Sequence, residues 1–206
     1  GGANACVLHY VENDGLLRDG DLLLIDAGCE LDGYASDITR TFPVSGRFSP
    51  EQREVYEIVL AAQQAAIDAV RPGASFMDYH QAALRILSQG LIDLRLIAGS
   101  VDGAIESEAY KPWYMHRTGH WLGLDVHDVG EYRTGSEDNA WVKLLPGMTL
   151  TVEPGLYFRP GTNVPPHLHG IGVRIEDDVL VRADGCTVYT SAPKTVAEIE
   201  EVMCHG

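Results

Sequence analysis

The sequence predicts an α+β domain in which antiparallel strands and two long helices share one core. Short apolar runs in the chain are typical of strands, although some of them end in an acidic residue, and the turn between the first two runs predicts an antiparallel hairpin. Residues 49–90 contain two successive helical patterns with recognisable start signals. The hairpin pattern recurs weakly in the second half of the chain, which indicates an internal repeat. With 206 residues, 45% of them apolar, the chain is long enough for one sizeable core.

The segment at each end of the chain has its own predicted structure. Cys6–Val11 is predicted to form a strand, and His9 within it is, taken alone, more often an ordinary polar residue than a catalytic one. Pro193–Met203 is predicted to form an amphipathic acidic helix.

The first hairpin places two carboxylates on one face. The run LLLIDAG contains Asp26, the run YASDITRT contains Asp37, and Asp32-Gly33 between them is a turn signal. In a hairpin with a two-residue loop, the residue numbers of two paired positions add up to an odd number, and side chains alternate between the two faces along each strand. Asp26 and Asp37 also have an odd sum, so they share a face whether the loop is Leu31-Asp32 or Asp32-Gly33. Neighbouring carboxylates repel each other unless a cation lies between them, which predicts a metal site. The alternative is a turn-capping Asp26 and a solvated Asp37.

Two helices follow the hairpin. The first is predicted over residues 49–70, because Ser49 and Gln52 form a capping box and Pro50 suits the first helical position. The second is predicted over residues 75–90, where it ends near a glycine. Their apolar spacing indicates a structural role for both helices.

Three histidines lie within twelve residues, at His116, His120 and His127. A core histidine with a backbone partner is the ordinary explanation for any one of them, but three beside an acidic site indicate at least one metal ligand. In a strand His116 and His120 would share a face and His127 would not, so the residues themselves leave the choice of ligand open. Asp125 and Asp128 are candidate acceptors that would orient the imidazoles.

The acidic strand pattern returns in the second half. The run MTLTVEPGLY predicts a strand that ends in Glu153, and GVRIEDD predicts a strand with Arg174 and Glu176 on one face. Residues 153–176 thus repeat the pattern of residues 26–40. The two predicted helices precede only the second copy of this pattern, residues 153–176. A symmetric fold would have a matching pair before residue 1, so we expect that the start of the domain lies outside this chain.

Composition argues against several classes of partner. The net charge of −15 argues against binding to nucleic acid or to an anionic membrane, and it suits a site that attracts cations. No apolar run is long enough to span a bilayer, and no basic-then-apolar leader opens the chain. The four cysteines are widely spaced, so we expect reduced thiols in a cytoplasmic protein.

The candidate ligands predict a particular chemistry. Four carboxylates and one imidazole suit two ions that share bridging carboxylates. Such donors fit Mn, Co, Fe or Zn and exclude thiolate-loving clusters. A pair of ions lowers the pKa of a shared water and polarises a carbonyl or phosphoryl oxygen, which is the chemistry of amide or phosphoester hydrolysis. The acidic chain weighs against a phosphoester substrate.

Four segments resemble the catalytic domain of the bacterial aminopeptidase P (Xaa-Pro aminopeptidase) family. They are LLLIDAGCELDGYASDITRTFP, GHWLGLDVHDVG, TLTVEPGLY and GIGVRIEDDVLV, and the likeness covers essentially the whole chain. The resemblance implies the pita-bread (creatinase/aminopeptidase-like) fold, shared with prolidase and methionine aminopeptidase. In that fold a curved antiparallel sheet is covered by helices and has an internal pseudo-twofold repeat.

The resemblance also implies roles for individual residues. Two divalent ions, most often Mn²⁺, with Zn, Co or Fe as alternatives, would have as ligands Asp26, Asp37, His120, Glu153 and Glu176. The implied substrate-side histidines are His9, His116 and His127. Arg174 matches an arginine that hydrogen-bonds around the metal shell, and Tyr157 matches a tyrosine near the bridging ligands.

The implied reaction is hydrolysis of the peptide bond between an N-terminal residue and a penultimate proline, with a metal-bridging hydroxide as nucleophile. Asp26 and one metal would hold the free amino terminus of the substrate, and Glu153 would relay the proton. His127 and His9 would steady the tetrahedral intermediate and the proline side. The expected partner is therefore a peptide with a penultimate proline, and the full-length protein is expected to be a homo-oligomer.

The family pattern also sets the expected domain organisation and the alternatives. Family members have a separate N-terminal domain, so we expect residues 1–206 to be the catalytic domain without that neighbour and incomplete at its own N-terminal end. Prolidase, an Xaa-Pro dipeptidase with the same chemistry, stays open as an alternative. A non-catalytic peptide-binding module predicts replaced ligands, whereas all five ligand positions hold competent residues. An inactive fragment is the remaining alternative.

Overall fold

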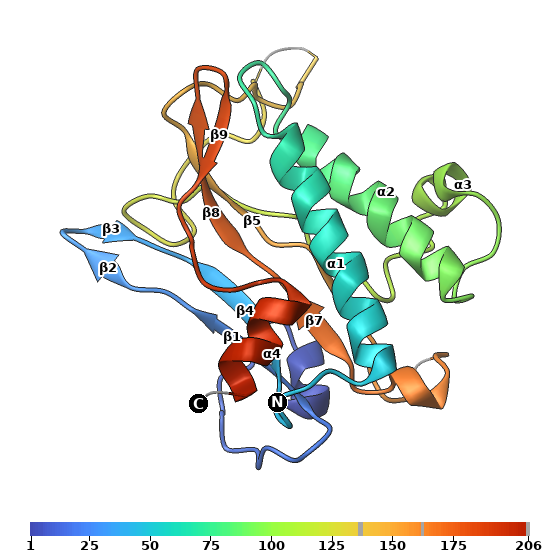
Figure 1. The fold of residues 1–206 in the computed structure, drawn as a ribbon. Helices are drawn as coiled ribbons and strands as arrows, with labels where there is room; N and C mark the ends of the chain where they lie inside the picture. The colour runs from blue at the N-terminus through green and yellow to red at the C-terminus, as the bar shows by residue number, and fades with distance from the viewer. Residues whose placement is uncertain (136–137, 162, 205–206) are drawn as a thin grey trace.

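The computed structural model describes residues 1–135, 138–161 and 163–204. Its α-helices are α1 (Pro50–Ala69), α2 (Asp78–Asp93), α3 (Val101–Glu106) and α4 (Val196–Cys204), and its 3₁₀ helices are η1 (Gly2–Cys6) and η2 (Pro166–Leu168). Its strands are β1 (Leu22–Ala27), β2 (Glu30–Leu31), β3 (Tyr34–Ala35), β4 (Ile38–Pro43), β5 (Thr149–Val152), β6 (Gly155–Tyr157), β7 (Gly172–Arg174), β8 (Asp177–Arg182) and β9 (Gly185–Val188). Helices α1 and α2 lie side by side and cover one side of the strands (Figure 1).

The two long helices pack closely because each presents an apolar stripe to the core. In α1 the residues Val55, Val59, Ala62 and Ala66 recur at helical spacing and are fully buried. The predicted start of α1 is confirmed, since Ser49 and the glutamine three residues later exchange side-chain to backbone hydrogen bonds in a capping box.

The predicted limits of the second helix are wrong at both ends. Helix α2 begins at Asp78, whose carboxylate accepts a hydrogen bond of 2.7 Å from the backbone N–H of Ser75, which lies outside the helix. At the other end, Gly90 does not stop the helix, which continues to Asp93. A Cβ atom at Gly90 would lie 2.4 Å from Cγ2 of Ile58, so this glycine serves the contact between α1 and α2.

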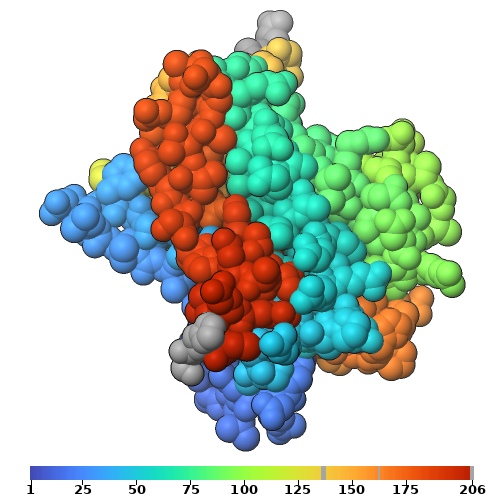
Figure 2. All heavy atoms as spheres, in the orientation of Figure 1, coloured from blue at the N-terminus to red at the C-terminus, as the bar shows by residue number. Residues whose placement is uncertain are grey.

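The first hairpin has the register that the Asp32-Gly33 loop requires. Asp26 pairs with Thr39 across β1 and β4, and residues 31 and 34 pair across β2 and β3. Asp32 and Gly33 have φ angles of 52° and 84°, as a two-residue hairpin turn with left-handed central residues requires. The hairpin β2–β3 projects from the body of the molecule (Figure 2).

The strands of the second half adjoin the first hairpin along β4. Strands β5, β8 and β9 form one antiparallel sheet, and β6 pairs with β7. Thr39 forms an antiparallel bridge with Glu176, and the hydroxyl of Thr41 donates to the carbonyl oxygen of Arg174 at 3.0 Å. The strand predicted over residues 172–178 is interrupted between β7 and β8, at this point of contact.

The strand predicted at Cys6–Val11 is wrong. The chain opens with η1, and Ala5 and Cys6 are buried beside β7. A Cβ atom at Gly172 would lie 2.7 Å from the backbone of Ala5, so the segment packs tightly against β7 without joining its hydrogen-bond ladder. Cys6 donates its thiol hydrogen to the carbonyl oxygen of Ile171.

Three further predictions concern the rest of the chain. The final helix exists as α4, which begins three residues later than predicted and ends one residue later. All four cysteines are free thiols. Within the residues that the structure describes, none of the helices has the length and apolar character needed to cross a bilayer.

Candidate metal centre

One pocket of about 330 Å³ gathers the predicted site residues. The predicted site residues among its lining are His9, Asp26, Asp37, His116, His120, His127, Glu153, Arg174 and Glu176. Tyr157, the remaining predicted residue, is fully buried and hydrogen-bonded to His116. The fold therefore brings together, in one pocket, side chains from both halves of the chain.

The first hairpin supplies Asp26 and Asp37. Asp26 lies on β1, and Asp37 immediately precedes β4, diagonally across the hairpin. A Cβ atom at Gly28 would lie 1.9 Å from the carbonyl oxygen of Ser36, so only glycine lets the two strands approach this closely. The backbone N–H of Asp37 donates to the buried carboxylate of Asp178 at 3.1 Å, which fixes the chain where its side chain enters the pocket.

The second half supplies Glu153 and Glu176. Glu153 follows the end of β5, and its backbone N–H donates to the carbonyl oxygen of Thr118 at 2.7 Å. Glu176 lies in the interruption between β7 and β8. The hydroxyl of Thr39 on β4 donates to Oε2 of Glu176 at 2.5 Å, so a side chain of the first hairpin orients a carboxylate of the second half.

His120 presents one ring nitrogen to these carboxylates. Its Nδ1 lies 2.9 Å from the carbonyl oxygen of Trp121, which requires the proton on Nδ1 and leaves the lone pair on Nε2. Nε2 lies 3.4 Å from Oδ2 of Asp37 and 3.8 Å from Oε1 of Glu153. Ligand atoms of Asp37, His120 and Glu176 all lie within 4.8 Å of one another.

Arg174 and His116 border the carboxylates and meet at Tyr157. Arg174 donates to Oδ2 of Asp26 at 2.5 Å and to the hydroxyl of Tyr157 at 3.2 Å. His116 has both ring nitrogens occupied, at 2.7 Å from the Tyr157 hydroxyl and 2.7 Å from the carbonyl oxygen of Arg117. Burial lowers the pKa of His116 to about 4, so this ring is neutral and accepts a hydrogen bond from Tyr157.

His9 and His127 lie on the open side of the pocket. Their ring centroids are 6.4 Å apart, and the ring of His127 stands edge-on to that of His120 at 4.2 Å. Partial burial and the neighbouring His120 lower the pKa of His127. The carboxylate of Asp128, one of the predicted imidazole acceptors, instead accepts from the backbone N–H groups of residues 124 and 129.

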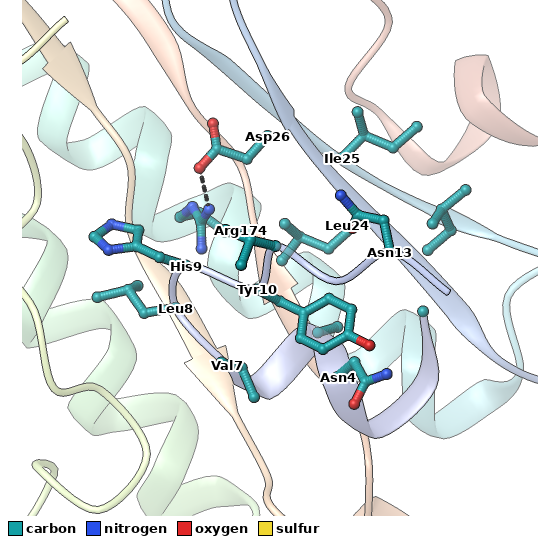
Figure 3. Close-up of a pocket in the computed structure, with 14 residues that line it drawn as sticks. Asn4, Val7, Leu8, His9, Tyr10, Asn13, Leu24, Ile25, Asp26 and Arg174 are labelled. Carbon is teal, nitrogen blue, oxygen red and sulfur yellow. Dashed lines mark hydrogen bonds and ion pairs between the residues drawn. The ribbon is translucent and has the colours of Figure 1, made fainter. Parts of the chain in front are cut away.

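A second cavity of about 500 Å³ adjoins the pocket (Figure 3). It lies between the opening segment and β1, and both cavities are lined by Leu8, His9, Asp26 and Arg174. The ion pair between Asp26 and Arg174 therefore stands at the boundary between the two cavities.

The electrostatics of the pocket match a cation site. Burial raises the pKa of Glu153 to about 7, and burial together with the nearby carboxylates raises that of Glu176 well above its ordinary value. Burial also raises the pKa of Asp26. Burial alone would lower the pKa of His120, but hydrogen bonding to Asp37 and to the backbone raises it overall. Buried carboxyl groups this close together are hard to ionise unless a cation lies between them. Such a group of oxygen donors, with one imidazole nitrogen among them, fits a divalent metal.

Thr39, which was not among the predicted site residues, contacts two of them. Its hydroxyl contacts Glu176 and also accepts from Nε of Arg174 at 3.3 Å. Its signal was available in the sequence, because alternation along β4 puts Thr39 on the same face as Asp37.

Comparison with known proteins gives one family and a consistent set of relatives. The model of metallopeptidase family M24 matches residues 1–183. The chain is 53% identical over 204 residues to a Xaa-Pro aminopeptidase of Haemophilus influenzae and 50% identical over 203 residues to one of Escherichia coli. Each match covers 98% of this chain but only 46% and 45% of the relative, so the chain spans a little under half the length of these proteins.

Solved structures agree with the sequence matches. The aminopeptidase PepP of Pseudomonas aeruginosa superposes with a TM-score of 0.96 at 58% identity, over 99% of this chain and 46% of that one. Aminopeptidase P of Escherichia coli, solved with the inhibitor Pro-Leu, superposes with a TM-score of 0.93 at 49% identity, over 99% and 46%. The predicted pita-bread fold, with antiparallel strands covered by helices, is therefore confirmed.

Proposed function

The chain belongs to metallopeptidase family M24, and we propose that it forms the catalytic part of a dinuclear aminopeptidase that cleaves the bond between an N-terminal residue and a penultimate proline. The observation that supports this most directly is a pocket lined by four carboxylates and His120, in which ligand atoms of Asp37, His120 and Glu176 lie within 4.8 Å of one another. The similarity to Xaa-Pro aminopeptidases, at about half identical residues, supports the choice of substrate.

The proposed ligands of the two divalent ions are Asp26, Asp37, His120, Glu153 and Glu176. Mn²⁺ is the proposed ion, and Zn, Co and Fe also accept oxygen donors with one nitrogen. When bound, such a pair would lower the pKa of a water, making it a nucleophile near neutral pH, and would polarise the scissile carbonyl.

Asp26 is proposed to bind the amino terminus of the substrate. Its side chain is 39% exposed, which leaves it accessible to a peptide, and one of its oxygens is already paired with Arg174. The remaining lone pairs of the carboxylate would serve a metal ion and the ammonium group of the substrate. Recognition of a free amino terminus would make the enzyme an exopeptidase.

Glu153 is proposed to move the proton. Its carboxylate lies at the edge of the ligand cluster, 3.8 Å from Nε2 of His120 and 4.0 Å from Nε of Arg174. A carboxylate in this position can take a proton from the attacking water and pass it to the leaving amine.

His127 and His9 are proposed to act on the substrate side. Both line the pocket, and their ring centroids are 6.4 Å apart, so the two rings flank its open side. In this proposal His127 donates a hydrogen bond to the developing oxyanion and His9 packs against the proline ring. His116 faces inward to Tyr157, so we propose that it orients the tyrosine and contacts substrate only at its ring edge.

The proposal is tested by peptide cleavage with metal analysis. Protein reconstituted with Mn²⁺ is expected to release the first residue from Xaa-Pro-Yaa-Zaa peptides and to leave Xaa-Ala-Yaa-Zaa controls intact. Cleavage of the dipeptide Xaa-Pro without cleavage of Xaa-Pro-Yaa-Zaa would identify a prolidase. Well under one ion per chain, with no cleavage of either peptide, would favour a peptide-binding module.

The free cysteines suit the proposed cytoplasmic location, where thiols stay reduced.

A further inference from the structure

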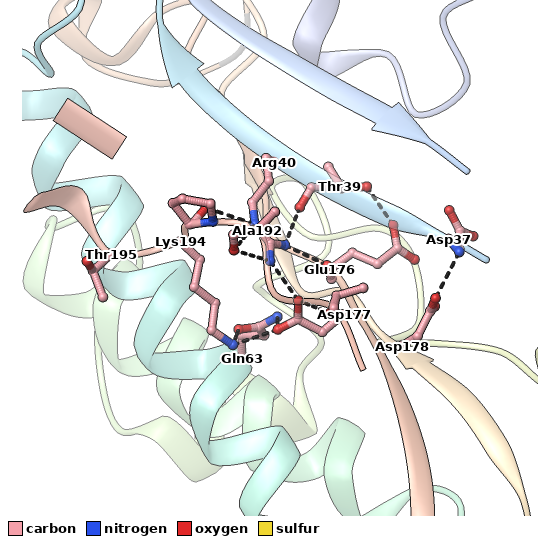
Figure 4. A network of polar contacts seen from close by, with 12 residues as sticks. Asp37, Thr39, Arg40, Gln63, Glu176, Asp177, Asp178, Ala192, Lys194 and Thr195 are labelled. Atoms are coloured by element: carbon pink, nitrogen blue, oxygen red, sulfur yellow. Dashed lines mark hydrogen bonds and ion pairs between the residues drawn. The ribbon is translucent and has the colours of Figure 1, made fainter. Parts of the chain in front are cut away.

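A cluster of charged and polar side chains around a buried ion pair lies next to Glu176, one of the pocket residues (Figure 4). It consists of Arg40, Asp177, Lys194 and Gln63, which we term the Arg40 cluster. Arg40 is 4% exposed and Asp177 is fully buried, and their side chains form an ion pair of 2.8 Å. Neither side chain lines the pocket, and the proposed mechanism assigns no role to the cluster.

Every N–H of the Arg40 guanidinium has a partner. Nη1 donates to the carbonyl oxygens of Thr39 at 2.9 Å and Glu176 at 2.7 Å. Nη2 donates to Oδ1 of Asp177. Nη2 and Nε also donate to the carbonyl oxygens of residues 192–193, at 2.9 Å and 3.0 Å. One planar group thus joins β4, the interruption between β7 and β8, and the segment before α4.

The carboxylate of Asp177 compensates the charge of the buried Arg40 guanidinium. Its Oδ1 accepts from Arg40 and from the hydroxyl of Thr190, and its Oδ2 accepts from Gln63 at 2.8 Å and from Lys194 at 2.6 Å. Burial alone would raise the pKa of Asp177, but these donors lower it overall. A buried pair with all partners present holds one geometry, since any shift would leave a charge unpaired.

We propose that Arg40 is a positioning residue for the metal centre, which it serves by holding the peptide oxygens of Thr39 and Glu176 in one place. Thr39 orients the Glu176 carboxylate through its hydroxyl, and Arg40 fixes the backbone of both partners of that hydrogen bond. The inference rests on the proposed role of Glu176 as a ligand. In this proposal Arg40 touches no ligand side chain, but it determines where the carboxylate of Glu176 points.

Lysine cannot replace arginine in this role. The guanidinium reaches two carbonyl oxygens with one nitrogen and a carboxylate with another, in a rigid plane, whereas an ammonium group offers three donors at a single point. Arg40→Lys therefore keeps the charge opposite Asp177 but loses contact with at least one of the two peptide oxygens. Residues that orient ligands from outside the metal typically alter metal affinity by about 10- to 100-fold.

The experiment is a Mn²⁺ titration of the purified protein, followed by calorimetry and by electron paramagnetic resonance. Four proteins are compared: unsubstituted, Arg40→Lys, Lys194→Met and Arg85→Lys. Lys194 contacts Asp177 but neither peptide oxygen, and Arg85 pairs with Asp102 on the exposed surface at 2.7 Å. Circular dichroism checks that each variant is folded, and Arg40→Lys is chosen over an apolar change because it leaves no buried carboxylate without a cation.

We expect Arg40→Lys to bind Mn²⁺ about 10- to 100-fold more weakly and to change the resonance of the bound ions. Arg85→Lys should keep the affinity and spectrum of the unsubstituted protein, and Lys194→Met should weaken binding far less than Arg40→Lys, because Asp177 keeps its contacts with Arg40 and Gln63. The inference is overturned if folded Arg40→Lys binds Mn²⁺ normally, or if Lys194→Met weakens binding equally, which would indicate general loosening of the fold. If the unsubstituted protein binds no Mn²⁺, the proposed function fails first and the inference fails with it.

Discussion

At the scale of single residues, Asp37 lies close to two of the other proposed ligands. It lies within reach of His120 and of the ligand atoms of Glu176. We predict that Asp37→Asn lowers turnover by at least about 10²-fold and abolishes binding of one ion, because an amide is a poor bridging ligand. The free energy of unfolding should change little, since the backbone N–H of residue 37 keeps its contact with Asp178. Normal metal content with normal turnover would refute the ligand assignment.

The carboxyl group of Glu153 makes stability depend on pH. In the metal-free fold its pKa is raised to about 7 from an ordinary value of 4.5, so the folded state holds its proton more tightly than the unfolded state. Its contribution to stability is therefore complete below pH 4.5 and is lost as the pH rises through 7. Buried His80 and His116, whose pKa values are lowered to about 4, act in the opposite direction below their ordinary value of 6.5.

Comparison with Glu153→Gln isolates that contribution. In the presence of a chelator, we predict nearly equal unfolding temperatures for the two proteins below pH 4.5 and a more stable variant well above pH 7, by up to about 3 kcal/mol. Thermal unfolding followed by circular dichroism measures the difference at each pH. A difference that does not change with pH would mean that the pKa of Glu153 is ordinary.

His127 separates metal binding from chemistry. It lies in the pocket beside His120, and a role on the substrate side predicts that His127→Ala keeps both ions and lowers kcat by about 10²-fold or more. Metal analysis and steady-state kinetics on the same preparation test this. Loss of metal in the variant would instead make His127 a ligand or a support of one.

At the scale of elements, local patterns predicted the structure wherever neighbours in sequence decide it. Period-two alternation left two registers open for the first hairpin, and the structure has the one in which Asp32 and Gly33 adopt positive φ in the turn. The capping box fixed the start of α1. Asp26 and Asp37 reached the same pocket, as the alternation requires in either register.

Predictions failed where distant contacts decide the local structure. The opening segment is not a strand because it packs against β7, far along the chain, as the bond from Cys6 to Ile171 illustrates. Strand parity could not choose among the histidines because residues 115–128 form no regular strand. The role of Arg40 has no signature in the sequence, since its partner Asp177 comes from another element.

The contact between α1 and α2 yields a prediction about Gly90. A Cβ atom at this position would lie 2.4 Å from Cγ2 and 2.9 Å from Cδ1 of Ile58. Helix propensity alone would make Gly90→Ala stabilising by about 1 kcal/mol. The contact should reverse the sign and destabilise the protein by roughly 1–3 kcal/mol. Chemical denaturation measures the change, and Gly90→Ala should cost less when it is introduced into an Ile58→Ala protein. A stabilised single variant would contradict the close packing.

At the scale of the whole molecule, the proposed metal centre joins the two halves of the fold. Its proposed ligands come from β1, from the start of β4, from the end of β5, from the interruption between β7 and β8, and from the irregular segment around His120. Contacts between the halves near the site include polar ones, such as the bridge and the side-chain hydrogen bond between Thr39 and Glu176. Ions bound here would therefore act as cross-links across the molecule.

Such cross-linking predicts a response to metal that extends beyond the pocket. Mn²⁺ at 100 times its dissociation constant should add about 2.7 kcal/mol per site to the free energy of unfolding, because it binds only the folded state. Amide hydrogen exchange should then slow in β1 and β4 as well as in β5 and β8, since opening either pair would release ligands. The exposed hairpin β2–β3 supplies no proposed ligand and serves as an internal control whose exchange should not change.

Two comparisons test whether the bound ions cause this response. Chelator should reverse both the added stability and the slower exchange, and Asp37→Asn should reduce both, because that variant lacks a carboxylate that reaches toward ligands of the second half. Protection confined to the residues next to the ligands would show instead that the halves are joined by their own packing. In that case the ions would contribute to catalysis alone, and the polar contacts along β4 would be sufficient to hold the two halves in register.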